Sequence, residues 1–324
     1  MKRPATLPAF SQEEYKKAHR LLATTVTFMM GRKFEEGDWA NVYCTAKSIP
    51  NAGWSNLNID IMYQGLGVEH KMLKVKSNKT ITEYCGTPRM HPSATRSIRI
   101  NSIDVDPDKV MVNVLQQYAD LIEERREKVR EDYPAREPDM RTGWLLWQDS
   151  LKEFLYFEEE MHPPNPNDYF AKWNESKGGG TRKPSKNLWI FEKETGIKRF
   201  SVTTSAGVKI QPYFDVPPPT DPNLYLFVVQ GEITDAGMIR IWVAATTREK
   251  LVRLVDPTNP QELSNFVLET AEQVEKVGGV EATKTRNAVP LLLFAEAYEK
   301  LKSKFPGTND DHMIQLLVEF FINQ

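Results

Sequence analysis

The chain has 324 residues, of which 40% are hydrophobic and 27% are charged, and its formal net charge is −2. This composition is typical of a soluble globular protein with one large domain or two, and it excludes a disordered or fibrous chain. No apolar run approaches the roughly 18–20 residues that a membrane-spanning helix needs. The two cysteines indicate neither a disulfide framework nor a zinc site, so we expect a cytoplasmic protein.

The first third of the chain predicts two helices followed by a β-hairpin. Ser11–Glu14 is a capping box, and it predicts a helix that continues to about Met30, with a second short helix around Phe34–Trp39. The segments Leu57–Tyr63 and Val68–Val75 alternate between apolar and polar residues, as strands do, and glycines lie between them. A further strand is expected over 97–103, and a helix over 108–130.

The prolines at 134 and 138 predict a boundary between two regions, 1–135 and 139–324. We expect the second region to open with a tryptophan-rich helix that holds Trp144, Trp147 and Phe154. Alternating and β-branched segments then predict strands over 188–192, 199–203, 208–214, 224–229 and 239–244. Helical patterns close the chain over 262–276, 289–302 and 312–322.

Positive charge is concentrated in two segments. Residues 71–100 and 170–212 each carry a formal charge of +6, although the whole chain is slightly acidic. Such segments can bind a polyanion, but they are equally typical of solvated lysine-rich surfaces.

The hairpin carries the residues with the clearest chemistry. Asp60 lies on the first strand, whereas Glu69 and Lys71 lie two residues apart on the second, so that both point to one face. Carboxylates are the ligands that Mg²⁺ prefers, and a neighbouring ammonium can orient a water or stabilise charge on a phosphate. The backbone carbonyl of His70 is a further candidate metal ligand, while its side chain should point to the other face.

The pattern Asp60…Glu69-His70-Lys71, on a hairpin after N-terminal helices, resembles the signature of the PD-(D/E)XK nucleases, with Ile59 in place of the proline. The resemblance covers roughly residues 10–110. It implies an α/β (α+β) fold, a restriction-endonuclease-like core of a mixed β-sheet flanked by helices, here with an additional α+β C-terminal region for DNA recognition or dimerisation. Family members often add an acidic residue from a preceding helix, and Glu36 or Glu35 fits that position.

The resemblance also implies an activity, which is Mg²⁺-dependent hydrolysis of double-stranded DNA by a type II restriction endonuclease. Two strands need two active sites, so a homodimer or higher homo-oligomer is expected. Phosphate contacts are expected from the basic residues Arg89, Arg96, Arg99, Arg182, Lys183 and Lys186.

Three other interpretations stay open at this point. The first is a repair or phage nuclease of the same superfamily with little sequence preference. The second is a DNA-binding or defence protein without catalysis. The third is a surface hairpin in which Glu69 and Lys71 simply form an ion pair.

Overall fold

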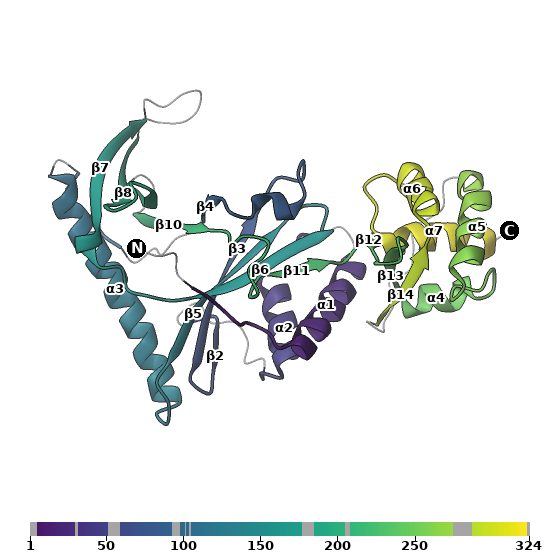
Figure 1. The fold of residues 1–324 in the computed structure, drawn as a ribbon, viewed down its shortest axis with the longest axis horizontal. Helices are drawn as coiled ribbons and strands as arrows, with labels where there is room; N and C mark the ends of the chain where they lie inside the picture. Colours follow the sequence, from purple (N-terminus) through teal and green to yellow (C-terminus); the bar gives the residue numbers. More distant parts are fainter. Residues whose placement is uncertain are drawn as a thin grey trace.

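The computed structural model describes residues 5–29, 32–50, 59–92, 98–100, 102–103, 105–176, 185–204, 208–274 and 287–322. Within these residues the chain forms three β-sheets with helices around them, which is the mixed α/β class that the sequence predicts (Figure 1). The finer expectation of a restriction-endonuclease-like core belongs with the proposed function below.

The central sheet positions the candidate site. Its strand order is β1-β6-β5-β3-β2, and β11 also pairs with β6. Only β3 and β5 run parallel, and every other pair is antiparallel. The strands are β1 (Thr6–Leu7), β2 (Ile61–Tyr63), β3 (Leu66–Lys74), β5 (Asp139–Trp147), β6 (Glu153–Glu160) and β11 (Tyr225–Val228).

The predicted hairpin forms, with a tighter turn than its glycines suggested. Tyr63 pairs with Leu66, so the loop is only Gln64 and Gly65. Both loop residues have positive φ angles, 49° and 83°, as a two-residue turn that matches the twist of a hairpin requires. The register places Ile61 opposite Val68. Asp60, one residue earlier, is therefore next to Glu69.

A long helix connects the hairpin to the rest of the sheet. Helix α3 (Pro107–Asp132) begins at the N-cap Asp106, whose side chain accepts hydrogen bonds from two backbone N–H groups of the first turn. The residues 134–138 then lead into β5, which pairs with β3 along nine positions, including Glu69 with Thr142. The proline-flanked segment thus joins α3 to β5 of the central sheet.

The tryptophan-rich helix expected after residue 139 is wrong, because this segment forms the strands β5 and β6. The apolar runs Trp144–Trp147 and Phe154–Phe157 are buried throughout. A strand covered on both faces shows no alternation of apolar and polar residues, so its sequence cannot be distinguished from that of a buried helix by periodicity alone.

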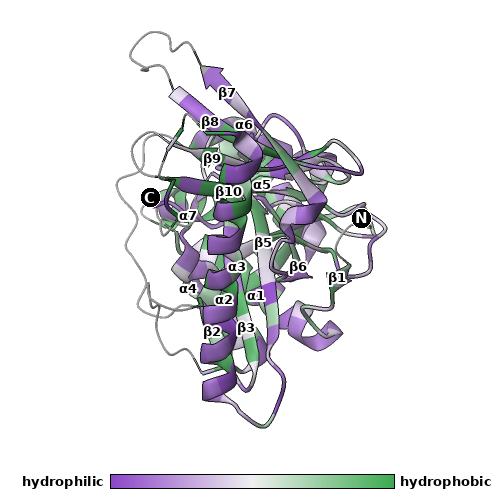
Figure 2. Cartoon of the chain, turned by 90° about the vertical axis from the view of Figure 1, so that its left-hand side faces the viewer, coloured by the Kyte–Doolittle hydropathy of each residue, from purple (hydrophilic) through white to green (hydrophobic). Residues whose placement is uncertain are grey.

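Two N-terminal helices cover one face of the central sheet. Helix α1 (Gln12–Thr27) begins with the predicted capping box at Ser11, which is confirmed. Helix α2 (Glu36–Lys47) is longer than expected and packs Trp39 and Tyr43 against the sheet. The α3 helix lies on the other side (Figure 1). Its outward surface is hydrophilic, whereas the strands behind it are largely hydrophobic (Figure 2).

A second sheet packs on the first half of α3. Its strand order is β4-β10-β9-β8-β7, and Val114 and Leu115 of the helix lie in one apolar cluster with Leu188, Ile190 and Val202. Residues 98–100 and 102–103, part of the strand expected over 97–103, are not in a strand. The elements are β4 (Pro88–Met90), β7 (Tyr169–Ser176), β8 (Ser185–Glu192), β9 (Lys198–Thr203) and β10 (Lys209–Asp215), with the short helices η1 (Ile81–Tyr84) and η2 (Pro166–Asp168).

The described residues of the C-terminal part form a three-stranded sheet and four α-helices, which share an apolar cluster. The helix expected from Val289 is wrong at its start, since this residue lies in a strand and the helix begins at Ala295. Among the described residues no helix is long and apolar enough to cross a bilayer. The elements are β12 (Glu232–Ile233), β13 (Ile239–Ala244), β14 (Ala288–Leu293), α4 (Ala245–Leu251), α5 (Pro260–Thr270), η3 (Ala271–Gln273), α6 (Ala295–Lys304) and α7 (Asp310–Ile322).

Candidate functional site

The two carboxylates that the sequence singled out lie side by side at the edge of the central sheet. Asp60 Oδ2 accepts a hydrogen bond of 2.6 Å from the backbone N–H of His70. This bond fixes the carboxylate of Asp60 against the strand that carries Glu69. Burial, and then the charge of Glu69, raise the pKa of Asp60 to about 7. Two neighbouring carboxylates repel each other when both are charged. A cation bound between them would therefore stabilise the charged pair.

Lys71 and Arg125 supply positive charge to the same edge. Lys71 Nζ is 2.5 Å from Glu69 Oε1, and Arg125 Nη1 of α3 is 3.3 Å from Glu69 Oε2. Burial acts to lower the pKa of Lys71, but the charges of Glu69 and Asp60 outweigh it and raise that pKa. The side chain of Lys71 is 25% exposed and that of Glu69 only 9%. An ion pair does form between Glu69 and Lys71, as the simplest interpretation expected, but it is largely removed from solvent.

Tyr118 of α3 completes this side of the site. Burial raises the pKa of its hydroxyl, the charge of Lys71 opposes this, and the charge of Glu69 raises it further. Tyr118 and Arg125 are seven residues apart, which is two helical turns, so both project from the same face of α3 toward the sheet.

His70 lies on the opposite face of β3, as the alternation of the strand predicts. Its ring packs edge-to-face against Trp39 and Tyr43, and its Nε2 is 3.1 Å from the hydroxyl of Tyr156. Burial, and then the charge of Lys71, lower its pKa to about 3, so the ring is neutral. Its side chain therefore anchors the strand that presents Glu69 and Lys71, and only its backbone carbonyl is left as a candidate ligand.

Glu36 lies at the first position of α2 and is exposed. Its charge contributes to the raised pKa of Asp60, so it lies within electrostatic reach of the two carboxylates. However, no three side chains of His, Cys, Asp or Glu come close enough to form a metal-ligand group among the residues that the structure describes. The structure thus brings together two carboxylates, with Glu36 near them as a third charge.

The donor set at this edge fits a hard divalent cation. Glu69 Oε2 is buried and accepts no hydrogen bond from the described part of the chain, although Arg125 lies within ion-pair distance. A buried carboxylate oxygen without a donor is costly unless another positive group satisfies it. Mg²⁺ is bound in proteins by one or two carboxylates together with waters and phosphate oxygens. Asp60 and Glu69 could hold it, with the carbonyl of His70 as a further candidate.

The basic residues expected to contact DNA are dispersed over several elements. Arg89 in β4 stacks on the ring of Tyr84, with its guanidinium carbon 4.4 Å from the ring centre. Arg99 is exposed beside the N-terminal half of α3, where its backbone pairs with Gln117. Lys186 in β8 lies over the ring of Trp173. The other three expected contacts, Arg96, Arg182 and Lys183, fall outside the described residues.

Sequence reasoning missed the contributions of α3. Both Arg125 and Tyr118 lie within the helix predicted over 108–130, but neither was singled out as a site residue. The available signal was their seven-residue spacing beside the apolar positions Ile122 and Val129. That spacing places both on or near the buried side of the helix, but it does not identify which element they face.

Comparison of the chain with protein-family models, with curated proteins and with solved structures gave no match in any of the three.

Proposed function

We propose that this chain is a nuclease that hydrolyses phosphodiester bonds of double-stranded DNA with Mg²⁺ bound by Asp60 and Glu69. The observation that carries the proposal is the convergence of these two carboxylates with Lys71 at one sheet edge, where the pKa of Asp60 is raised to about 7. The mixed sheet with helices on both faces is consistent with the restriction-endonuclease-like core that the sequence resembles.

Each residue has a defined task in this mechanism. Asp60 and Glu69 would hold the cation, and the hydrogen bond from His70 N–H keeps the carboxylate of Asp60 in place. Bound there, Mg²⁺ would lower the pKa of an attacking water and offset the charge that develops on the phosphate. The ammonium of Lys71 would donate a hydrogen bond to a phosphate oxygen, or orient the water. Arg125 adds a second positive group that can turn from Glu69 to the phosphate.

We extend the proposal to sequence-specific cleavage by a homodimer, as in type II restriction endonucleases. Cutting both strands of a duplex requires two sites, and a twofold symmetric pair supplies them. The support for this step is the sequence resemblance alone. Sizing of the protein in solution and sequencing of the cut ends test it, since discrete ends indicate a restriction enzyme and scattered ends a nuclease with little preference.

Cleavage of phage or plasmid DNA by the purified protein tests the activity itself. We expect cleavage with Mg²⁺ and none with a chelator. With Mg²⁺, Asp60→Asn should give no cleavage and Lys71→Ala a rate at least about 100-fold lower. Asp149→Asn is a matched control, because Asp149 is an exposed carboxylate that pairs with Lys74 away from the site. DNA binding without cleavage by a folded wild-type protein would favour a binding or defence protein instead.

A further inference from the structure

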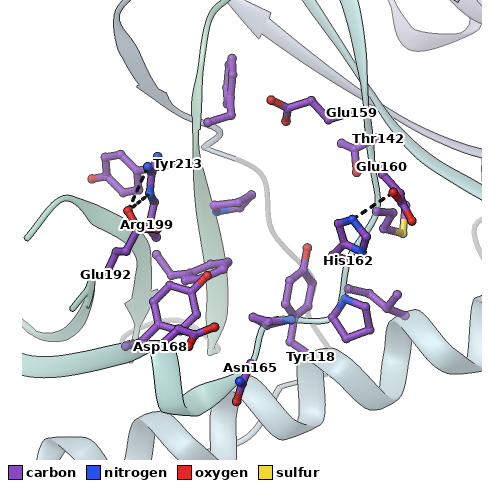
Figure 3. Close-up of a pocket in the computed structure, with 18 of the residues that line it drawn as sticks. Tyr118, Thr142, Glu159, Glu160, His162, Asn165, Asp168, Glu192, Arg199 and Tyr213 are labelled. Carbon is purple, nitrogen blue, oxygen red and sulfur yellow. Dashed lines mark hydrogen bonds and ion pairs between the residues drawn. The ribbon is translucent and has the colours of Figure 1, made fainter. Parts of the chain in front are cut away.

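A pocket of about 430 Å³ opens beside the candidate site, between α3, η2 and the strands of two sheets (Figure 3). This volume is within the range of small-molecule sites, which is roughly 300–1,000 Å³. Its wall is rich in aromatic rings, to which Tyr118, Trp144, Tyr169, Tyr213 and Phe214 contribute. Flat aromatic surfaces of this kind stack favourably on nucleobases.

The pocket contains the carboxyl group of Glu159, only one oxygen of which accepts a hydrogen bond. Glu159 Oε2 accepts a hydrogen bond of 3.0 Å from Trp144 Nε1, and within the described residues this carboxyl group has no other hydrogen bond. Figure 3 shows its carboxyl group directed into the pocket. Arg199, in contrast, forms ion pairs with Glu192 at 3.2 Å and with Asp215 at 2.9 Å, so its guanidinium group is already neutralised by carboxylates.

The pocket lies on the same face of the central sheet as Glu69, one of the proposed metal-binding carboxylates. Glu69 pairs with Thr142 between β3 and β5, and Thr142 pairs with Glu159 between β5 and β6. Directly paired residues of neighbouring strands share a face of the sheet, so these three side chains form one row. Tyr118 lines the pocket and also interacts electrostatically with Lys71 and Glu69. A DNA strand at Glu69 would therefore run past the mouth of the pocket.

The charge of the pocket indicates which part of a nucleotide it accepts. Five acidic residues line it, against Arg199 and His162. Such a lining repels phosphates, but it attracts the amino groups on the edges of bases. The expected occupant is therefore a base whose sugar and phosphate remain outside.

We infer that the pocket binds one base rotated out of the DNA helix, and that Glu159 reads an amino group next to an unprotonated ring nitrogen. Cytosine and adenine share this edge, and thymine lacks it. A carboxylic acid matches the edge with two hydrogen bonds: its carbonyl oxygen accepts from the amino group and its O–H donates to the ring nitrogen. The inference deepens the proposed nuclease function and depends on it.

The surroundings of Glu159 favour the protonated acid that this recognition needs. Burial raises the pKa of Glu159 to about 7, the hydrogen bond from Trp144 acts against this, Asp215 raises it further and Arg199 lowers it. The other titratable residues that line the pocket are Tyr118, Glu160, His162, Asp168, Tyr169, Glu192 and Tyr213. Glu159 thus carries a proton through much of the acidic range and loses it above neutral pH.

Binding of DNA in the absence of metal tests the inference separately from cleavage. The probes are fluorescent duplexes with one unpaired cytosine, adenine or thymine, because an unpaired base costs least to extrude. At pH 6 we expect the wild type to bind the cytosine and adenine duplexes on the order of tenfold more tightly than the thymine duplex. At pH 8.5 this ratio should collapse, and this comparison needs no variant.

Substitutions of Glu159 sharpen the test. Glu159→Leu removes both hydrogen bonds and should abolish the preference at either pH. Glu159→Gln keeps one donor and one acceptor, so its preference should persist and no longer depend on pH. Glu137→Gln is the matched control, since this side chain is 89% exposed, pairs with Arg130 and does not line the pocket.

Equal binding of all three duplexes by the wild type, or a preference that survives Glu159→Leu, would overturn the role of the pocket and leave the cleavage proposal standing. Failure of the folded wild type to bind any of the duplexes would also overturn the role of the pocket, and cleavage with Mg²⁺ remains the separate test of the nuclease function.

Discussion

Replacing Asp60 with Asn should abolish DNA cleavage and at the same time stabilise the metal-free protein. The carboxylate of Asp60 is partly buried next to Glu69, and both features disfavour its charge. An asparagine oxygen can still accept the hydrogen bond from His70 N–H, so the substitution removes the charge and keeps the geometry.

The raised pKa sets the size and the pH range of this effect. A change from the ordinary value of 3.8 to about 7 corresponds to an upper limit of about 4 kcal/mol. Because the sheet edge retains contact with water, we expect about 1–2 kcal/mol, or a few degrees in the thermal midpoint. Between pH 4 and 7 the folded state keeps a proton that the unfolded chain has released, so stability falls as the pH rises through this window.

Thermal unfolding in a chelating buffer, from pH 4.5 to pH 8, measures the effect. The midpoint of Asp60→Asn should exceed that of the wild type at pH 8, and the difference should vanish toward pH 4.5. Asp149→Asn removes an exposed carboxylate and should leave the midpoint unchanged at both pH values. A destabilised Asp60→Asn protein at pH 8, or a difference independent of pH, would refute the reasoning.

Three further predictions address the ammonium of Lys71 and the packing that supports strand β3. Lys71→Ala should reduce the cleavage rate at least about 100-fold, measured in single turnover, while circular dichroism shows an intact fold. Tyr156→Phe removes the hydroxyl that hydrogen-bonds to both His70 and Glu158. This should lower the free energy of unfolding, measured in a urea titration, by about 1–3 kcal/mol. An unchanged value would show that these two hydrogen bonds do not support β3. A Cβ atom at Gly143 would collide with the hydroxyl of Tyr156 and the ring of His70, so Gly143→Ala should cost about 1–3 kcal/mol, and a neutral effect in the same titration would contradict the packing described.

Local signals in the sequence predicted a substantial part of the fold. The capping box at Ser11 is confirmed, because a cap depends on residues within one turn, and the helix predicted over 108–130 forms as α3. The second alternating segment forms β3, and with it the face shared by Glu69 and Lys71. The first segment is a strand only over Ile61–Tyr63, so Asp60 lies just before β2 and not within it as predicted. The segment around Trp144 was assigned to a helix because a strand buried on both faces loses the alternation that identifies strands.

The rest of the site depends on contacts that no local pattern encodes. Arg125 reaches Glu69 only because α3 crosses over between β3 and β5. The pocket around Glu159 joins residues of α3, β5, β6, β9 and β10, which are far apart in the chain. Their side chains meet through tertiary packing, so the sequence alone identified the two carboxylates and the ammonium but not the elements that surround them.

Titration calorimetry with Mg²⁺ and Mn²⁺ tests most directly whether Asp60 and Glu69 share one divalent cation. We predict one site per chain in the wild type, loss of binding in Asp60→Asn and in Glu69→Gln, and unchanged binding in Asp149→Asn. Binding that persists in both site variants, or no binding to the folded wild type with or without DNA, would contradict the account.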